Sequence, residues 1–204
     1  MYENENDQVD AIKRFFAENG KALAVGVILG IGALVGWRYW NSHQIEAARG
    51  SSQQYENTVS AISADRPESL AAAEKFAADN KNTYGALASL EVAQQLVDKN
   101  ELDKAAAQLQ QGLAAAGDDN LKAVINLRLA RIQVQQKKAD EALKTLDTIK
   151  GEGFAAIVAD LRGEALLSKG DKQGARSAWE AGVKSNASPA LSEMMQMKIN
   201  NLSV

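Results

Sequence analysis

The feature that most constrains this chain is an apolar run near its amino end. Sixteen consecutive residues, 22–37, carry neither a charge nor a polar side chain. As a helix, the run is about 24 Å long, a little under the roughly 30 Å of a bilayer's hydrocarbon core. Basic residues flank it, and aromatic residues that favour the headgroup region extend it. The run therefore predicts a transmembrane helix over residues 21–40, whose membrane-boundary residues are Lys21, Trp37, Arg38, Tyr39 and Trp40.

Two other interpretations of the run are open. A buried core helix would need protein packed against every face. A cleaved signal peptide would need a small-residue site just downstream, whereas here the run leads into the aromatic and charged stretch WRYW. We therefore favour a permanent anchor.

The basic residues around the run predict its orientation. Lys13, Arg14 and Lys21 precede the span, and Arg38 and Arg49 follow it. Because cytoplasmic flanks carry the excess of Lys and Arg, three against two favours an amino terminus in the cytoplasm.

The leader, residues 1–20, is expected to form one short helix that ends at Gly20. Val9, Ile12 and Phe16 would share a face of this helix. The leader could dock a partner or lie on the bilayer, and a solvated tail fits equally well.

Glycines spaced four residues apart within the span let a second helix approach closely in lipid. The alternative is that glycine is merely tolerated at these positions. The candidate helix-association residues are Gly26, Gly30, Gly32 and Gly36.

The composition excludes several classes of function. The chain has 204 residues, a net charge of -3, no Cys and one His, His43. A net acidic chain lacks the basic surface of a nucleic-acid binder. Without Cys and a second His it has no disulfides, thiolate zinc sites or cysteine nucleophile. Acidic residues near expected helix starts are explained by the helix dipole, so we expect no catalytic residues, no metal site and no cofactor.

Residues 41–83 are expected to form a stalk and packing helices. Apolar and small residues recur every three or four positions, the spacing of one helix face. This stripe consists of Ile45, Ala48, Ser52, Tyr55, Val59 and Ile62. A break at 65–67 ends it, and Pro67 then suits the first turn of a second helix.

Residues 84–187 contain an internal repeat. The segments 100–113, 137–150 and 170–183 each have a central alanine, a large apolar residue four positions later and a small residue twelve positions earlier. Small residues let two helices of a hairpin approach closely, and this pattern resembles the tetratricopeptide repeat. The sequence thus predicts an all-α chain, with three such repeats in a right-handed helical-hairpin solenoid; a generic helical bundle is the alternative. The repeat-packing residues are Ala93, Ala105, Leu109, Ala130, Ala142, Leu146, Gly163, Ala175 and Trp179.

Residues 188–204 are predicted to form a capping helix that begins with Ser188 as N-cap and Pro189 in its first turn. Its methionines, Met194, Met195 and Met197, are expected either on the core face or as an adaptable binding surface.

The tetratricopeptide resemblance implies a concave groove lined by the first helix of each repeat. The positions that some family members use as a Lys–Asn clamp for a peptide carboxylate are occupied differently here, so we expect no clamp. An apolar groove of mixed charge suits a hydrophobic helix or a non-native segment, unless the chain's own early helices fill it. The candidate partner-groove residues are Leu87, Leu90, Gln94, Val97, Val124, Leu127, Arg131, Val134, Ile157, Asp160, Glu164 and Leu167.

The segments YENENDQVDAIKRFFAENGKALAVGVILGIGALVGWRYWNSHQ, NKNTYGALASL and PALSEMMQMKIN closely resemble the YfgM family of ancillary SecYEG translocon subunits, and the likeness covers essentially the whole chain. The resemblance implies a single-pass protein of the bacterial inner membrane with a periplasmic repeat domain. It also implies partnership with SecYEG and the anchored chaperone PpiD, and a non-enzymatic role in passing newly translocated proteins to periplasmic chaperones. Two other hypotheses are an envelope-stress regulator acting through the leader, and a passive envelope scaffold.

Overall fold

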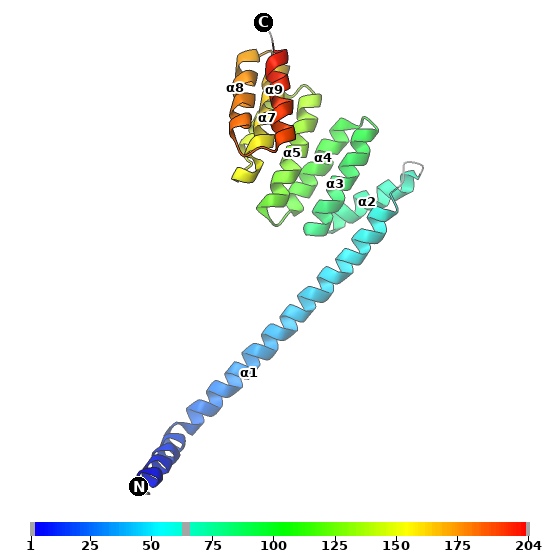
Figure 1. Cartoon of the computed structure of the whole chain (residues 1–204). Helices are drawn as coiled ribbons and strands as arrows, with labels where there is room; N and C mark the ends of the chain where they lie inside the picture. Colours follow the sequence, from blue (N-terminus) through cyan, green and yellow to red (C-terminus); the bar gives the residue numbers. More distant parts are fainter. Residues whose placement is uncertain (1–2, 63–65, 203–204) are drawn as a thin grey trace. The chain divides into compact units, whose positions relative to one another are not determined.

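A computed structural model describes residues 3–62 and 66–202 of the chain (Figure 1). Within these ranges the regular elements are helices only, which confirms the predicted all-α class. The helices are α1 (Glu3–Ser60), α2 (Pro67–Asp79), α3 (Thr83–Asp98), α4 (Leu102–Ala115), α5 (Asp119–Gln135), α6 (Ala139–Asp147), the 3₁₀ helix η1 (Glu152–Phe154), α7 (Ala155–Ser168), α8 (Lys172–Lys184) and α9 (Pro189–Asn201).

The chain divides into two compact units, residues 1–50 and residues 51–204. The first unit is helical throughout its described part, so the expected helix stop at Gly20 is wrong. A glycine inside a helix costs only about 1 kcal/mol relative to alanine, and no proline follows to break the hydrogen-bond ladder. Within the described residues, α1 is the one helix long and apolar enough to cross a membrane, and none of its most apolar window is buried by protein.

The last turns of α1 belong to the second unit and pack against its first two helices. The Tyr55 ring lies 6.5 Å from the Phe76 ring of α2 and 5.9 Å from the Tyr84 ring of α3. Burial, and then the nearby charge of Glu91, raise the pKa of Tyr55. The predicted stripe is half-buried from Ser52 to Ile62 but exposed at Ile45. Two expected positions, the side chain of Ala48 and the break at Asp65, lie outside the described residues.

Three helical hairpins follow, α3/α4, α5/α6 and α7/α8, and their turns are alike. Each turn has one residue with a left-handed backbone: Asn100 (φ 60°), Lys137 (φ 61°) and Gly170 (φ 85°). In each, the next N–H donates to a carbonyl five residues back, as in Glu101 N to Leu96 O at 2.8 Å. This is the hydrogen bond of a Schellman turn. The same turn chemistry therefore folds each hairpin.

Polar side chains set where several of these helices begin. Asn82 accepts hydrogen bonds from the backbone of Tyr84 and Gly85, and Asp118 accepts one from Leu121 N at 2.9 Å. Ser188 caps α9, and Pro189 stands in its first turn as predicted. Such caps satisfy backbone donors that have no partner within the helix.

The predicted repeat-packing residues are all buried. A close fit lies between α7 and α8, where a Cβ on Gly163 would come within 2.3 Å of Trp179 Nε1. The indole N–H of Trp179 donates to Asp160 O at 3.1 Å. A large side chain is thus accommodated because the facing residue has none.

The helix α9 covers the end of the array. Met195 is fully buried and lies against Gly182 of α8, while Met194 and Met197 are exposed. One of the three methionines is therefore core, and the other two are on the surface.

Replacing Gly163 with alanine is expected to destabilise the repeat domain by about 1–3 kcal/mol, because the buried Trp179 ring has no room to move away. Thermal unfolding of the full chain in detergent, followed by circular dichroism, measures the effect. Gly117→Ala is the matched control, since nothing lies within 4 Å of its Cβ. Equal melting temperatures for the two variants would contradict this packing.

Candidate functional site

The predicted groove residues lie on α3, α5 and α7, and they differ in accessibility. Those available to a partner are Gln94, Val124, Arg131 and Leu167, which are exposed; those half-buried are Leu87, Val97, Val134, Ile157 and Glu164; those buried are Leu90, Leu127 and Asp160. The face formed by these helices is therefore not uniformly open.

Between α5 and α7 the face is closed by apolar packing. Leu127 and Val134 of α5 belong to the same core cluster as Ile157 and Leu161 of α7. Three of the expected groove residues, Leu127, Val134 and Ile157, therefore pack the second repeat against the third.

Residues of α3 and α5 share one apolar core cluster, but the backbones of the two helices lie farther apart than those of α5 and α7. A hollow of about 300 Å³ remains beside them. Its floor is apolar and includes the buried residues Ala93, Leu109 and Ile132. We call it the α3–α5 hollow; its lining residues are Ala93, Gln94, Val97, Leu109, Arg128, Arg131, Ile132 and Gln135.

Two arginines, Arg128 and Arg131, give the α3–α5 hollow its charge. Both are exposed, and neither forms an ion pair or a side-chain hydrogen bond within the part of the chain that the structure describes. Of the two, the sequence pattern predicted Arg131 alone. Arg128 and Gln135 lie three residues before and four residues after it, on the same helix face, and that spacing could have identified them.

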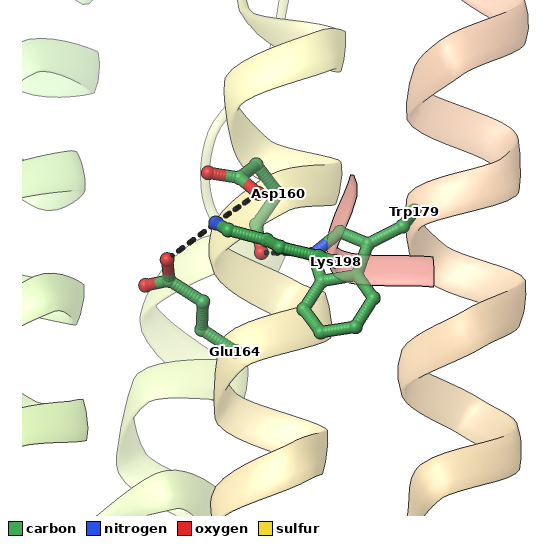
Figure 2. A network of polar contacts seen from close by, with 4 residues as sticks. All are labelled: Asp160, Glu164, Trp179 and Lys198. Atoms are coloured by element: carbon green, nitrogen blue, oxygen red, sulfur yellow. Dashed lines mark hydrogen bonds and ion pairs between the residues drawn. The ribbon is translucent and has the colours of Figure 1, made fainter. Parts of the chain in front are cut away.

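In the third repeat, the chain's own C-terminal helix closes the groove (Figure 2). Lys198 Nζ of α9 lies 2.6 Å from Asp160 Oδ1 and 2.7 Å from Glu164 Oε1. The same ammonium is 5.7 Å from the centre of the Trp179 ring. The two acidic groove positions therefore share one ammonium from within the chain, supplied by a late helix and not by the early helices considered above.

The environment of Lys198 favours its charged form. Burial alone would lower its pKa, but the hydrogen bonds with Asp160 and Glu164 outweigh burial and raise the pKa above the ordinary lysine value. Because Asp160 is itself 3% exposed, its carboxylate depends on this lysine for charge compensation.

The residues of the predicted membrane boundary are exposed, with Trp37 at 67%, Tyr39 at 76% and Trp40 at 65%. Nothing lies within 4 Å of the Cβ positions of the four candidate helix-association glycines. Among the residues described, no group of three or more His, Cys, Asp or Glu side chains is placed to hold a metal ion.

Comparisons with known proteins place these features in context. A family model described as a tetratricopeptide repeat-like domain matches residues 13–204, which confirms the predicted architecture. A protein of Escherichia coli (strain K12) named "Ancillary SecYEG translocon subunit" is 81% identical over 204 residues, 100% of this chain and 99% of that protein. A protein of the same name from Haemophilus influenzae is 36% identical over 199 residues, 97% of each chain. Another, from Buchnera aphidicola subsp. Schizaphis graminum, is 33% identical over 149 residues, 73% of this chain and 77% of that protein. No solved structure matches.

Replacing Lys198 with methionine is expected to destabilise the domain by about 1–3 kcal/mol, since it leaves the buried Asp160 carboxylate unpaired. The melting temperature of the full chain measures this. Lys184→Met, at an exposed position of α8, is the control. A Lys198→Met protein as stable as this control would show that α9 is held by apolar contacts alone.

The raised pKa of Lys198 also predicts a pH dependence. The unfolded lysine titrates near pH ~10.4, so the stabilisation is fully present below that pH and is lost as the pH rises through the higher folded-state pKa. Melting temperatures in alkaline buffers should fall more steeply for the natural chain than for Lys198→Met. Parallel curves would contradict the expectation.

Proposed function

This chain belongs to the family of ancillary SecYEG translocon subunits that carry a tetratricopeptide repeat-like domain, and we propose that it works beside the SecYEG translocon as a membrane-anchored, non-enzymatic adaptor. The proposal rests on family membership together with a helix able to cross a membrane. A repeat array that exposes a groove is an architecture typical of protein recognition.

The transmembrane helix determines where in the cell the repeat domain lies. We propose a single pass through the bacterial inner membrane, with the amino terminus in the cytoplasm and residues 41–204 in the periplasm. The basic residues Lys13, Arg14 and Lys21 before the span support this orientation. Tethering near the channel exit raises the local concentration of emerging segments without any new contact.

The α3–α5 hollow is the surface we propose for partner binding. The observation that carries this assignment is that the remainder of the predicted groove is closed by the chain itself, through Leu127 and Ile157 in one place and Lys198 in another. The α3–α5 hollow keeps an apolar floor and two arginines that have no ion-pair partner among residues 3–62 and 66–202. We propose that PpiD, or non-native periplasmic chains on their way to chaperones, bind there.

Site-specific photo-crosslinking in intact cells tests this assignment. A photoreactive amino acid at Gln94 or Gln135, both at the α3–α5 hollow, is expected to capture translocon subunits, PpiD or translocating chains. The same amino acid at the exposed position Glu180 of α8 is the control. Arg128→Glu combined with Arg131→Glu should reduce the capture several-fold.

Equal capture from the α3–α5 hollow and from Glu180, or no effect of the charge reversal, would overturn the assignment. Anchoring with no protein captured from any position would favour the passive scaffold.

A further inference from the structure

In the first and third repeats, the second helix passes unusually close to the first at a glycine. Gly112 of α4 and Gly182 of α8 each stand seven residues after the central alanine of their repeat. A Cβ on Gly112 would lie 2.7 Å from Ser89 Cβ, and a Cβ on Gly182 would lie 3.0 Å from Ala159 Cβ. Close approach at this position therefore needs glycine facing a small residue.

The second repeat has no glycine at this position. The residue seven positions after Ala142 is Ile149, not glycine. An isoleucine cannot approach α5 as closely as glycine does, and α6 ends at Asp147, before this position is reached. By contrast, α4 and α8 continue past their glycines, to Ala115 and Lys184.

Where α6 stops, a cavity of about 660 Å³ opens between α4, α5 and the segment that follows α6. Its size lies within the range of about 300–1,000 Å³ typical of ligand sites. We call it the α4–α6 cavity; its lining residues are Gln110, Leu113, Asp119, Lys122, Ala123, Asn126, Leu129, Gln133, Lys144, Thr145, Thr148, Ile149 and Lys150.

Two buried amides on α5 line this cavity at positions that are not amides in the other repeats. Asn126 aligns with Ser89 and Ala159, and Gln133 aligns with Leu96 and Leu166. Asn126 is 8% exposed and Gln133 is 6% exposed. The second repeat thus places polar groups where its neighbours pack small or apolar side chains.

Each amide forms one side-chain hydrogen bond within the described part of the chain and leaves the other end of its side chain unused. Asn126 Nδ2 donates to Thr148 Oγ1 at 3.2 Å, and Gln133 Oε1 accepts from Thr145 Oγ1 at 2.8 Å. Asn126 Oδ1 and Gln133 Nε2 are left as an acceptor and a donor. Neither atom is among the fully buried, unpaired side-chain atoms of the described residues, so both are open to water and to a molecule that enters the cavity.

The spacing of the two amides suits a peptide backbone. Seven residues of helix separate them, a rise of about 10 Å, which equals the length of about three residues of extended chain. An extended segment offers both N–H donors and C=O acceptors over that length.

The lysines and the apolar residues that line the cavity indicate the composition of the extended segment that would bind there. Three lysines line the cavity against one carboxylate, and Asp119 is already paired with Lys122 at 3.4 Å. Lys144 and Lys150 form no ion pair with a carboxylate in residues 3–62 and 66–202. Leu113, Leu129 and Ile149 supply apolar surface.

From this we propose that the α4–α6 cavity is a second protein-binding site, which takes an extended acidic segment carrying an apolar side chain. It shares no lining residue with the α3–α5 hollow. With 3.6 residues per turn, Asn126 and Gln133 lie on roughly the opposite face of α5 from Arg128 and Arg131. One helix therefore serves two separate sites.

Selection of random dodecapeptides displayed on phage against the full-length chain in detergent micelles tests the proposal. We expect the selected peptides to be enriched in Asp and Glu around one apolar residue. Gln133→Leu, which restores the residue type of the other repeats, should abolish their binding. Because it also removes the hydrogen bond from Thr145, it should lower stability by no more than about 1.5 kcal/mol. Lys144→Glu combined with Lys150→Glu should weaken binding by about tenfold or more.

The matched control is Arg128→Glu with Arg131→Glu, which alters the α3–α5 hollow and should leave the selected peptides bound. If the selection shows no acidic enrichment, or if Gln133→Leu binds the peptides as well as the natural chain, the proposal is overturned. If the arginine pair abolishes binding and the lysine pair does not, acidic segments bind the α3–α5 hollow instead, which also overturns it.

Discussion

The structure depends first on an apolar helix surface that the described residues of its own unit leave exposed. Side chains such as Ile28 and Leu29 are each 68% exposed along α1, and burying one of them fully is worth about 1.5–3 kcal/mol. A helix satisfies its backbone hydrogen bonds internally, so hydrocarbon can surround it at no cost to the backbone. Lipid is the environment that both properties fit, and every proposal about where the repeats act follows from it.

Beyond residue 66, the array is held together by the fit of small residues to close helix contacts. Gly163 leaves room for the Trp179 ring, and Gly112 and Gly182 let the second helix of a hairpin lie against the first. Where Ile149 replaces glycine, the helix stops early and the array opens. The size of the residue at this repeat position therefore determines both where the two helices of a hairpin pack closely and where the cavity opens.

Sequence reasoning could find the anchor and the repeats, since both are patterns of neighbouring residues along the chain. It did not find that Lys198 closes the third repeat, because that contact joins side chains on separate helices. The repeated hairpin turn was hidden by Lys137, a residue type with no preference for a left-handed backbone. The predicted helix end at Gly20 was wrong because glycine, although common at helix ends, is here inside a long helix. The glycine-to-Ile149 exchange was visible in the repeat alignment, and only the structure gave it meaning.

The helix α5 stands between two openings of different character, the α3–α5 hollow with its arginines and the α4–α6 cavity with its amides and lysines. Both depend on the anchor to bring them to partners. Washing membranes with alkaline sodium carbonate, which strips proteins not embedded in lipid, therefore tests the central claim most directly. The full-length chain should stay with the membrane pellet, while a chain lacking residues 22–37 should not. Release of the intact full-length chain into the supernatant would contradict the account.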